Sequence, residues 1–416
     1  MKRSLVPFFA VLALSAAVSA FAANFDWPQW RGPDRTDVSK ETGLLKSWPA
    51  DGPKRVWLYK NAGDGYSAPA IVAGKLFTMG TRNDEEVLIA LNADDGSELW
   101  FAPIGSATRN DRGNGPRGTP TVDGDRLYGM SGRGELACAQ VSDGKVLWKK
   151  KMTDLGGSAP TWGFAESVLV DGDNVICTPG GSKGTVAALD KKTSELRWQS
   201  AEFTDSASHS SIIPIVHNGV RQYVQLTKKT IVGIAPKDGK VLWKASFPGA
   251  GAAAVIPTPI YSAGHVFATA GYGVGCMLAK IGDSAEAETV YQNKNMVNHH
   301  GGVVLLDGHL YGYSDSAGWV CLNFKTGEQV WASRNLGKGA VTYADGMLYC
   351  VEEGKGIVAL VEASPKGWNE KGRFTLEPRT SVRTRDNRVW THPVISNGKL
   401  YLRDQDLIYC HDVKQR

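Results

Sequence analysis

The sequence has few cysteines and little net charge, and after its first residues it has no long hydrophobic run. Only six of the 416 residues are cysteine, and none stands next to another. The formal charge of +5, which falls to +3 without Lys2 and Arg3, is too small to indicate a nucleic-acid partner. No later stretch approaches the roughly 20 apolar residues that cross a bilayer, so we expect no membrane span.

The first 22 residues have the layout of a secretory signal peptide. Met1-Lys2-Arg3 is basic, Leu5 to Val18 is apolar, and Ala20-Phe21-Ala22 offers an Ala-x-Ala cleavage site. An N-terminal membrane anchor is the alternative, but the apolar run is short for a span. No cysteine lies near the cleavage site, so we do not expect lipid attachment. We therefore expect a periplasmic or secreted protein from which residues 1–22 are removed.

The strongest signal is a repeated segment in which a tight turn leads into a strand that carries Trp. Trp100, Trp148, Trp198 and Trp243 follow one another at intervals of 48, 50 and 45 residues, and Trp331 comes 88 residues later. A degenerate copy, with Tyr291 in the Trp place, fits into that last interval. Asp-Gly and Thr-Gly before the Trp strands are hairpin signals. Periods of about 40–50 residues built only of strands and turns are typical of propeller blades.

Eight units can be counted, and the last one is incomplete. It stops after Cys410 without a Trp strand, whereas the strand around Trp57 has no unit before it. The sequence therefore predicts an all-β fold, an eight-bladed β-propeller over residues 53–416 that is closed by the N-terminal strand. The alternative is seven blades, with Gly271–Tyr291 as an insertion. Residues 23–52, which are rich in Trp, are expected to pack on the propeller.

A small residue stands ten positions before each Trp: Ala90, Cys138, Ala188, Gly233 and Cys321. We interpret these small residues as a slot for the Trp of a neighbouring blade. Cysteines at equivalent places of separate blades are held far apart, so we expect six free and mostly buried thiols. An exported location, where disulfides are common, is the consideration against this.

The run Ala90-x-Asn92-x-x-x-Gly96-x-x-x-Trp100, with its relatives, resembles the tryptophan-docking motif of the PQQ-dependent quinoproteins. The resemblance covers the whole chain after the signal peptide. It implies an eight-bladed propeller, as in quinoprotein alcohol dehydrogenases and in the outer-membrane assembly lipoprotein of the Bam complex. The opening Trp27-Pro28-Gln29-Trp30-Arg31-Gly32-Pro33 also looks like the start of PQQ-like propeller proteins that have no assigned reaction.

The chain departs from the functional motifs of these relatives. Quinoprotein alcohol dehydrogenases typically carry an adjacent cysteine pair beside the cofactor, and this chain has none. Their quinohaemoprotein relatives carry Cys-x-x-Cys-His, whereas Cys410-His411 lacks the first cysteine. The assembly lipoprotein has a lipid-modified cysteine, and none follows the signal peptide here. The resemblance therefore predicts the fold and leaves the function open.

In a propeller, the loops that enter the innermost strands meet at one mouth of the central channel. Charged, aromatic and histidine side chains gather in these loops, and the candidate ligand-binding residues are Arg117, Trp162, Glu166, His209, His299, His300 and His392. Adjacent strand residues point to opposite faces, so the His299–His300 pair does not predict a metal site. The Arg379, Arg383, Arg385 and Arg388 run is either a solvated loop or an anion-binding rim.

Two functions remain open. The first is an exported, non-catalytic and monomeric propeller that binds a protein or a small ligand at its mouth, with no cofactor. The alternative, implied by the resemblance, is a quinoprotein dehydrogenase that oxidises an alcohol or sugar. In that case PQQ would lie flat against Trp162, a Ca²⁺ would take Glu166 as an oxygen ligand, and Arg117 would hold a PQQ carboxylate.

Overall fold

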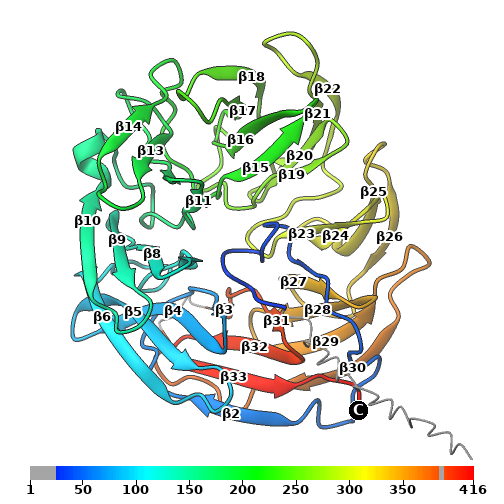
Figure 1. Ribbon diagram of the computed structural model, residues 1–416. Helices are drawn as coiled ribbons and strands as arrows, with labels where there is room; N and C mark the ends of the chain where they lie inside the picture. The colour runs from blue at the N-terminus through cyan, green and yellow to red at the C-terminus, as the bar shows by residue number, and fades with distance from the viewer. Residues whose placement is uncertain (1–24, 384–387) are drawn as a thin grey trace, which may run out of the picture.

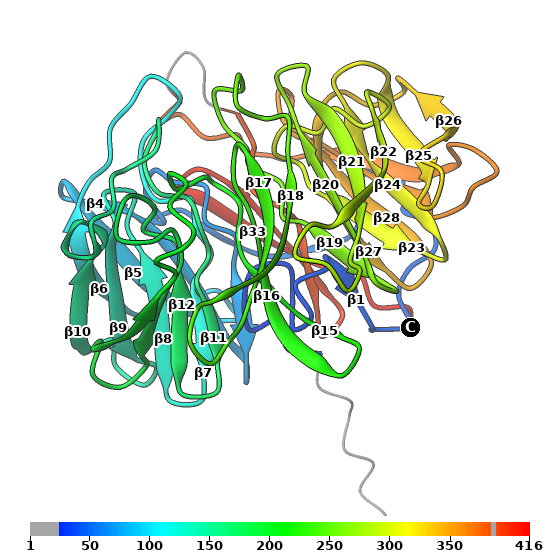
Figure 2. The ribbon, with the colours of Figure 1, turned by 90° about the horizontal axis from the view of Figure 1, so that it is seen from above.

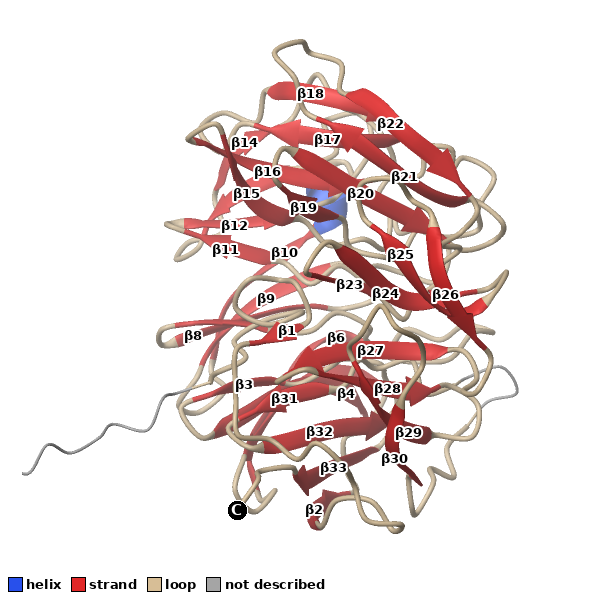
Figure 3. Cartoon of the chain, turned by 90° about the vertical axis from the view of Figure 1, so that its right-hand side faces the viewer, coloured by secondary structure: helices blue, strands red, loops and turns tan. Residues whose placement is uncertain are grey.

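The fold is a ring of small antiparallel sheets with almost no helix (Figure 3). The computed structural model describes residues 25–383 and 388–416. Within these residues the only helix is the short 3₁₀ turn η1 (Met152–Leu155), and no helix is long and apolar enough to cross a membrane. The expected signal peptide lies outside the described residues.

Eight sheets surround a central channel, as Figure 1 shows. Blades 1 to 4 contain β3 (Ala70–Val72), β4 (Lys75–Arg82), β5 (Glu85–Asn92) and β6 (Glu98–Ser106); β7 (Thr121–Asp123), β8 (Arg126–Met130), β9 (Glu135–Gln140) and β10 (Val146–Lys151); β11 (Leu169–Asp171), β12 (Asn174–Cys177), β13 (Ala187–Asp190) and β14 (Leu196–Gln199); β15 (Ile213–His217), β16 (Val220–Leu226), β17 (Thr230–Ile234) and β18 (Val241–Ser246).

Blades 5 to 8 repeat the arrangement, so the predicted count of eight is confirmed. They contain β19 (Ile260–Ser262), β20 (His265–Ala270), β21 (Gly275–Lys280) and β22 (Glu288–Asn293); β23 (Val303–Leu306), β24 (His309–Ser314), β25 (Gly318–Asn323) and β26 (Gln329–Ser333); β27 (Gly339–Ala344), β28 (Met347–Glu352), β29 (Ile357–Glu362) and β30 (Glu370–Thr375), with β1 (Val38–Ser39) on the inner edge; and β31 (Val394–Ser396), β32 (Lys399–Asp404), β33 (Leu407–Asp412) and β2 (Arg55–Tyr59).

The N-terminal strand closes the ring, as predicted. β2 pairs antiparallel with β33, and Trp57 lies opposite Cys410. The last blade therefore takes its outer strand from the start of the propeller, so blade 8 has four strands and the ring is closed between blades 8 and 1.

Each blade buries its faces against its two neighbours. The buried hydrophobic side chains form eight clusters, and each cluster is made mainly by two consecutive blades. Successive side chains of a strand point to opposite faces of the sheet. Both faces carry apolar side chains, because each sheet packs against a neighbouring blade on either side. All six cysteines are free and buried in these layers, as expected.

In most repeats the Trp docks one blade onto the next, whereas Trp243 donates to Gln222 of its own blade. Trp100 donates from Nε1 to the carbonyl of Val141, and a Cβ added to Gly144 would lie 2.5 Å from its ring. Tyr291 takes the same place in blade 5, since its hydroxyl donates to the carbonyl of Phe324 and its ring lies against Gly327. At these two positions the ring docks on a glycine turn of the next blade.

The interpretation of the small residues was wrong. Ala90 is the cross-strand partner of Trp100 within its own blade, and Gly233 has the same relation to Trp243. A Cβ on Gly233 would lie 2.2 Å from the Trp243 ring. Gly233 must therefore be small, because the Trp243 ring lies across it.

The first part of the segment that precedes β2, residues 25–39, lies in the channel on one side of the disc. Trp27 pairs with Ile71 of β3, and Pro28 accepts a hydrogen bond from Val122 of β7. In Figures 1 and 2 this dark-blue segment lies inside the ring, toward the side from which the β15–β16 hairpin projects. Arg31 and Arg35 are 2% and 1% exposed, so the segment is part of the folded core of the channel.

Candidate functional site

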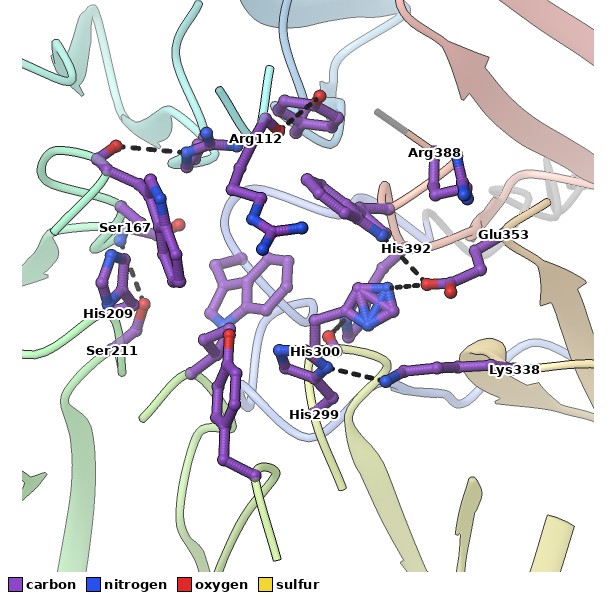
Figure 4. Close-up of a pocket in the computed structure, with 18 residues that line it drawn as sticks. Arg112, Ser167, His209, Ser211, His299, His300, Lys338, Glu353, Arg388 and His392 are labelled. Atoms are coloured by element: carbon purple, nitrogen blue, oxygen red, sulfur yellow. Dashed lines mark hydrogen bonds and ion pairs between the residues drawn. The ribbon is translucent and has the colours of Figure 1, made fainter. Parts of the chain in front are cut away.

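A cavity of about 340 Å³ lies at the other side of the channel, above the N-terminal segment. We call it the central cavity. Side chains from all eight blade-entry loops or from neighbouring turns surround it (Figure 4). Its wall is formed by Trp30, Tyr66, Arg112, Arg117, Trp162, Ala165, Ser167, His209, Ser211, Ile256, Tyr272, His299, His300, Lys338, Glu353, Arg388, Trp390 and His392. Six of the seven sequence candidates are in this set, and Glu166 is outside it.

Aromatic rings form much of the wall. Trp162 and Tyr272 both have left-handed backbone conformations, with φ of 73° and 57°. Such conformations are strained for large side chains and cluster at functional sites. Trp162 is held by a hydrogen bond from its Nε1 to Asp111 (3.2 Å), and the Tyr272 ring meets His299 edge-on at 4.4 Å. The backbone therefore gives up local stability to present two rings to the cavity.

Within the described residues no carboxylate forms a direct ion pair with Arg117, although the charge of buried Glu86 raises its pKa. Its guanidinium donates to uncharged oxygens only, those of Trp162, Gly113 and Asn110. It also lies 4.8 Å from the centre of the Tyr66 ring, a cation–π contact. Burial lowers the pKa of Arg117 from its ordinary value, but an arginine so placed remains charged at neutral pH.

Lys338 and Glu353 belong to a polar network on one wall. Lys338 Nζ lies 2.7 Å from His299 Nδ1 and 2.7 Å from a carboxylate oxygen of Asp315. Glu353 accepts from Nε1 of Trp390 and lies 2.9 Å from Nε2 of His300. Burial, together with the charge of Lys338, lowers the pKa of His299 to about 4. Burial likewise holds the pKa of His300 well below its usual range, so both rings are neutral at pH 7.

The floor is built jointly by blade 8 and the N-terminal segment. The Trp30 ring lies 4.5 Å from the ring of His392. His392 places Nδ1 at 3.1 Å from Asp37 and Nε2 at 2.9 Å from the carbonyl of His300. Asp37 is also bound by Arg31 at 2.6 Å. This buried network fixes Trp30 at the bottom of the cavity.

Glu166 points behind the wall. It is 2% exposed, and its two carboxylate oxygens accept from the backbone N–H and the hydroxyl of Thr178. Burial raises its pKa from 4.5 to about 7. Among the described lining residues Glu353 is the one carboxylate, so they do not present the oxygen-rich ligand set that Ca²⁺ requires. The cavity wall therefore does not fit a calcium-bound quinone.

The arginine run divides between two roles. Arg379 and Arg383 both bind the buried carboxylate of Asp404, whereas Arg388 lines the cavity. Arg385 lies outside the described residues. Trp30, Tyr272 and Glu353 line the cavity although the sequence did not predict them there. Trp30 precedes the propeller, and the other two residues lie in turns that follow β20 and β28, so none of the three is in a blade-entry loop.

Comparison with known proteins assigns the family. A family model described as outer membrane protein assembly factor BamB matches residues 83–333 and 285–407. The chain belongs to this family. A curated BamB-family relative, outer membrane protein assembly factor BamB of Yersinia pestis, is 23% identical over 239 residues, which are 52% of this chain and 55% of the relative. The match thus spans about half the length of that protein.

Solved structures share the BamB-family fold at low identity. BamB from Moraxella catarrhalis is 15% identical, with a TM-score of 0.62 over 87% of this chain and 98% of the other. Quinohemoprotein alcohol dehydrogenase from Comamonas testosteroni is 11% identical, with a TM-score of 0.65 over 95% of this chain and 82% of the other. Identities this low show the shared propeller and no shared chemistry.

Proposed function

We propose that this chain is an exported, non-catalytic binding propeller whose central cavity holds a small anionic ligand. Membership of the BamB family supports a binding role, since the relatives are named as assembly factors. The observation that carries the anionic ligand is Arg117, a buried guanidinium whose partners are all uncharged, beside a wall of aromatic rings. A bound carboxylate or phosphate would supply the direct anionic partner that the hydrogen bonds of Arg117 do not include.

The cavity size favours a small molecule over a folded partner. A volume of about 340 Å³ is at the lower end of the range for small-ligand sites, roughly 300–1,000 Å³. The family name points to protein partners as well, and an acidic peptide segment could reach the same cation. A small anionic molecule and an acidic peptide segment share the anionic group and differ in size.

Isothermal titration calorimetry with 2-naphthoate tests the proposal. We expect binding of 2-naphthoate, no binding of the 2-naphthylmethylammonium cation, and at least about tenfold weaker binding by Arg117→Met, because a charge-assisted hydrogen bond contributes about 1.5–3 kcal/mol. Arg221→Met is the matched control, since Arg221 pairs with Asp171 on the outer surface. Equal binding of anion and cation would contradict the proposal, and tighter binding of a poly-glutamate peptide would assign the site to a protein partner.

A further inference from the structure

His209 places an acceptor without a donor in the wall of the central cavity. Its Nε2 lies 2.8 Å from the carbonyl oxygen of Thr161, which can only accept, so Nε2 carries the proton. The side chain is 6% exposed, and no described residue donates to Nδ1. Burial, reinforced by the charge of Arg117, lowers the pKa of His209 to about 4. At neutral pH the ring is therefore neutral, with the lone pair of Nδ1 unused.

Buried polar atoms in folded proteins are almost always hydrogen-bonded, because an unpaired one loses its hydration without compensation. An exception inside a ligand-sized cavity therefore indicates a group that the ligand supplies. The surroundings agree, since the Trp162 ring, held on a left-handed backbone, lies 6.3 Å from the His209 ring. A flat ligand against Trp162 would bring its edge toward His209.

We propose that the central cavity binds a flat anionic ring compound whose own N–H or O–H group donates a hydrogen bond to Nδ1 of His209. This rests on the proposed function and adds the chemistry of the ligand. The aromatic wall recognises the ring, Arg117 recognises the acid group, and His209 selects a donor over an acceptor. Lys338 and Glu353 do not compete for this role, because they are already engaged with His299, Asp315 and Trp390.

Three naphthoates of matched shape separate these features. The probes are 6-hydroxy-2-naphthoate, which carries a donor, 2-naphthoate, which carries neither donor nor acceptor at that edge, and 6-methoxy-2-naphthoate, which carries only an acceptor. Calorimetry on the full chain should show the hydroxy compound binding about tenfold more tightly than either of the others, the effect of one hydrogen bond to a buried acceptor. The series holds the ring and the acid constant.

Variants of His209 place the effect at this side chain. In His209→Phe the preference for the hydroxy compound should fall to about onefold, whereas His209→Gln, whose amide oxygen can accept, should retain part of it. His265→Phe is the matched control, because His265 lies at the β19–β20 hairpin of blade 5, does not line the cavity, and hydrogen-bonds the carbonyl of Ala263. Melting temperatures show whether each variant is folded, and the Gln variant keeps the test decisive if the Phe variant is not.

The outcomes separate the two proposals. Equal affinities of the three naphthoates for the wild-type chain, or a preference that survives in both His209 variants, would overturn the role of His209 and leave the anion site standing. Failure of all three anions to bind would overturn the anion site and this inference together.

Discussion

The closure of the ring predicts a specific cost for removing Trp57. The side chain is 8% exposed, donates from Nε1 to the carbonyl of Ala93 at 3.1 Å, and lies so close to Gly96 that a Cβ there would be 2.7 Å from its ring. It therefore joins blade 8 to blade 1. Trp57→Ala should lower the free energy of unfolding by about 3–5 kcal/mol, the range for truncating a buried Trp.

Urea unfolding followed by far-ultraviolet circular dichroism measures this cost. Trp100→Ala is the matched control, because Trp100 makes the same contacts one blade further on, with Val141 and Gly144. If the N-terminal strand is an integral blade strand, the two variants should lose similar stability. A loss below about 1 kcal/mol for Trp57→Ala, with a full loss for Trp100→Ala, would refute the reasoning on closure.

Two further predictions concern buried charges. Burial raises the pKa of Glu166 from 4.5 to about 7, so the folded wild type loses stability as the carboxyl ionises. Between pH 4.5 and pH 7 and above, its free energy of unfolding should fall by on the order of 3 kcal/mol relative to that of Glu166→Gln. The same pH dependence of unfolding by urea in both proteins would contradict this. Arg31→Met leaves the Asp37 carboxylate without its arginine and should lower the free energy of unfolding by about 3–5 kcal/mol in the same assay. It should also weaken naphthoate binding. Unchanged binding would show that the N-terminal segment does not support the site.

Much of the fold could be predicted because it repeats. The Gly and Trp positions recur in most blades. The missing Trp strand after Cys410 and the extra one at Trp57 indicate closure directly. The role of the small residues was misassigned because a ten-residue spacing does not reveal whether two residues meet within a blade or between blades. The strand pairing of the structure shows that Ala90 lies opposite Trp100 in the same sheet.

The candidate site was only partly accessible from sequence. Ring symmetry brings the entry loops together, which is why Arg117, Trp162 and His209 could be named. Symmetry does not tell which way a side chain points, so Glu166 was placed in the mouth although it binds Thr178 behind the wall. The contribution of Trp30 depends on how a non-repeating segment enters the channel, and no period encodes that.

The central claim is that an anion binds in the central cavity. Indole ¹H–¹⁵N spectra, assigned with single Trp→Phe variants, report on the 13 Trp side chains during a titration with 6-hydroxy-2-naphthoate. We expect the signals of Trp30, Trp162 and Trp390, which line the cavity, to shift with a common affinity. The signal of Trp100, which docks blade 1 onto blade 2, should not shift. Shifts confined to the docking Trp residues, or no shift at saturating ligand, would contradict the central claim.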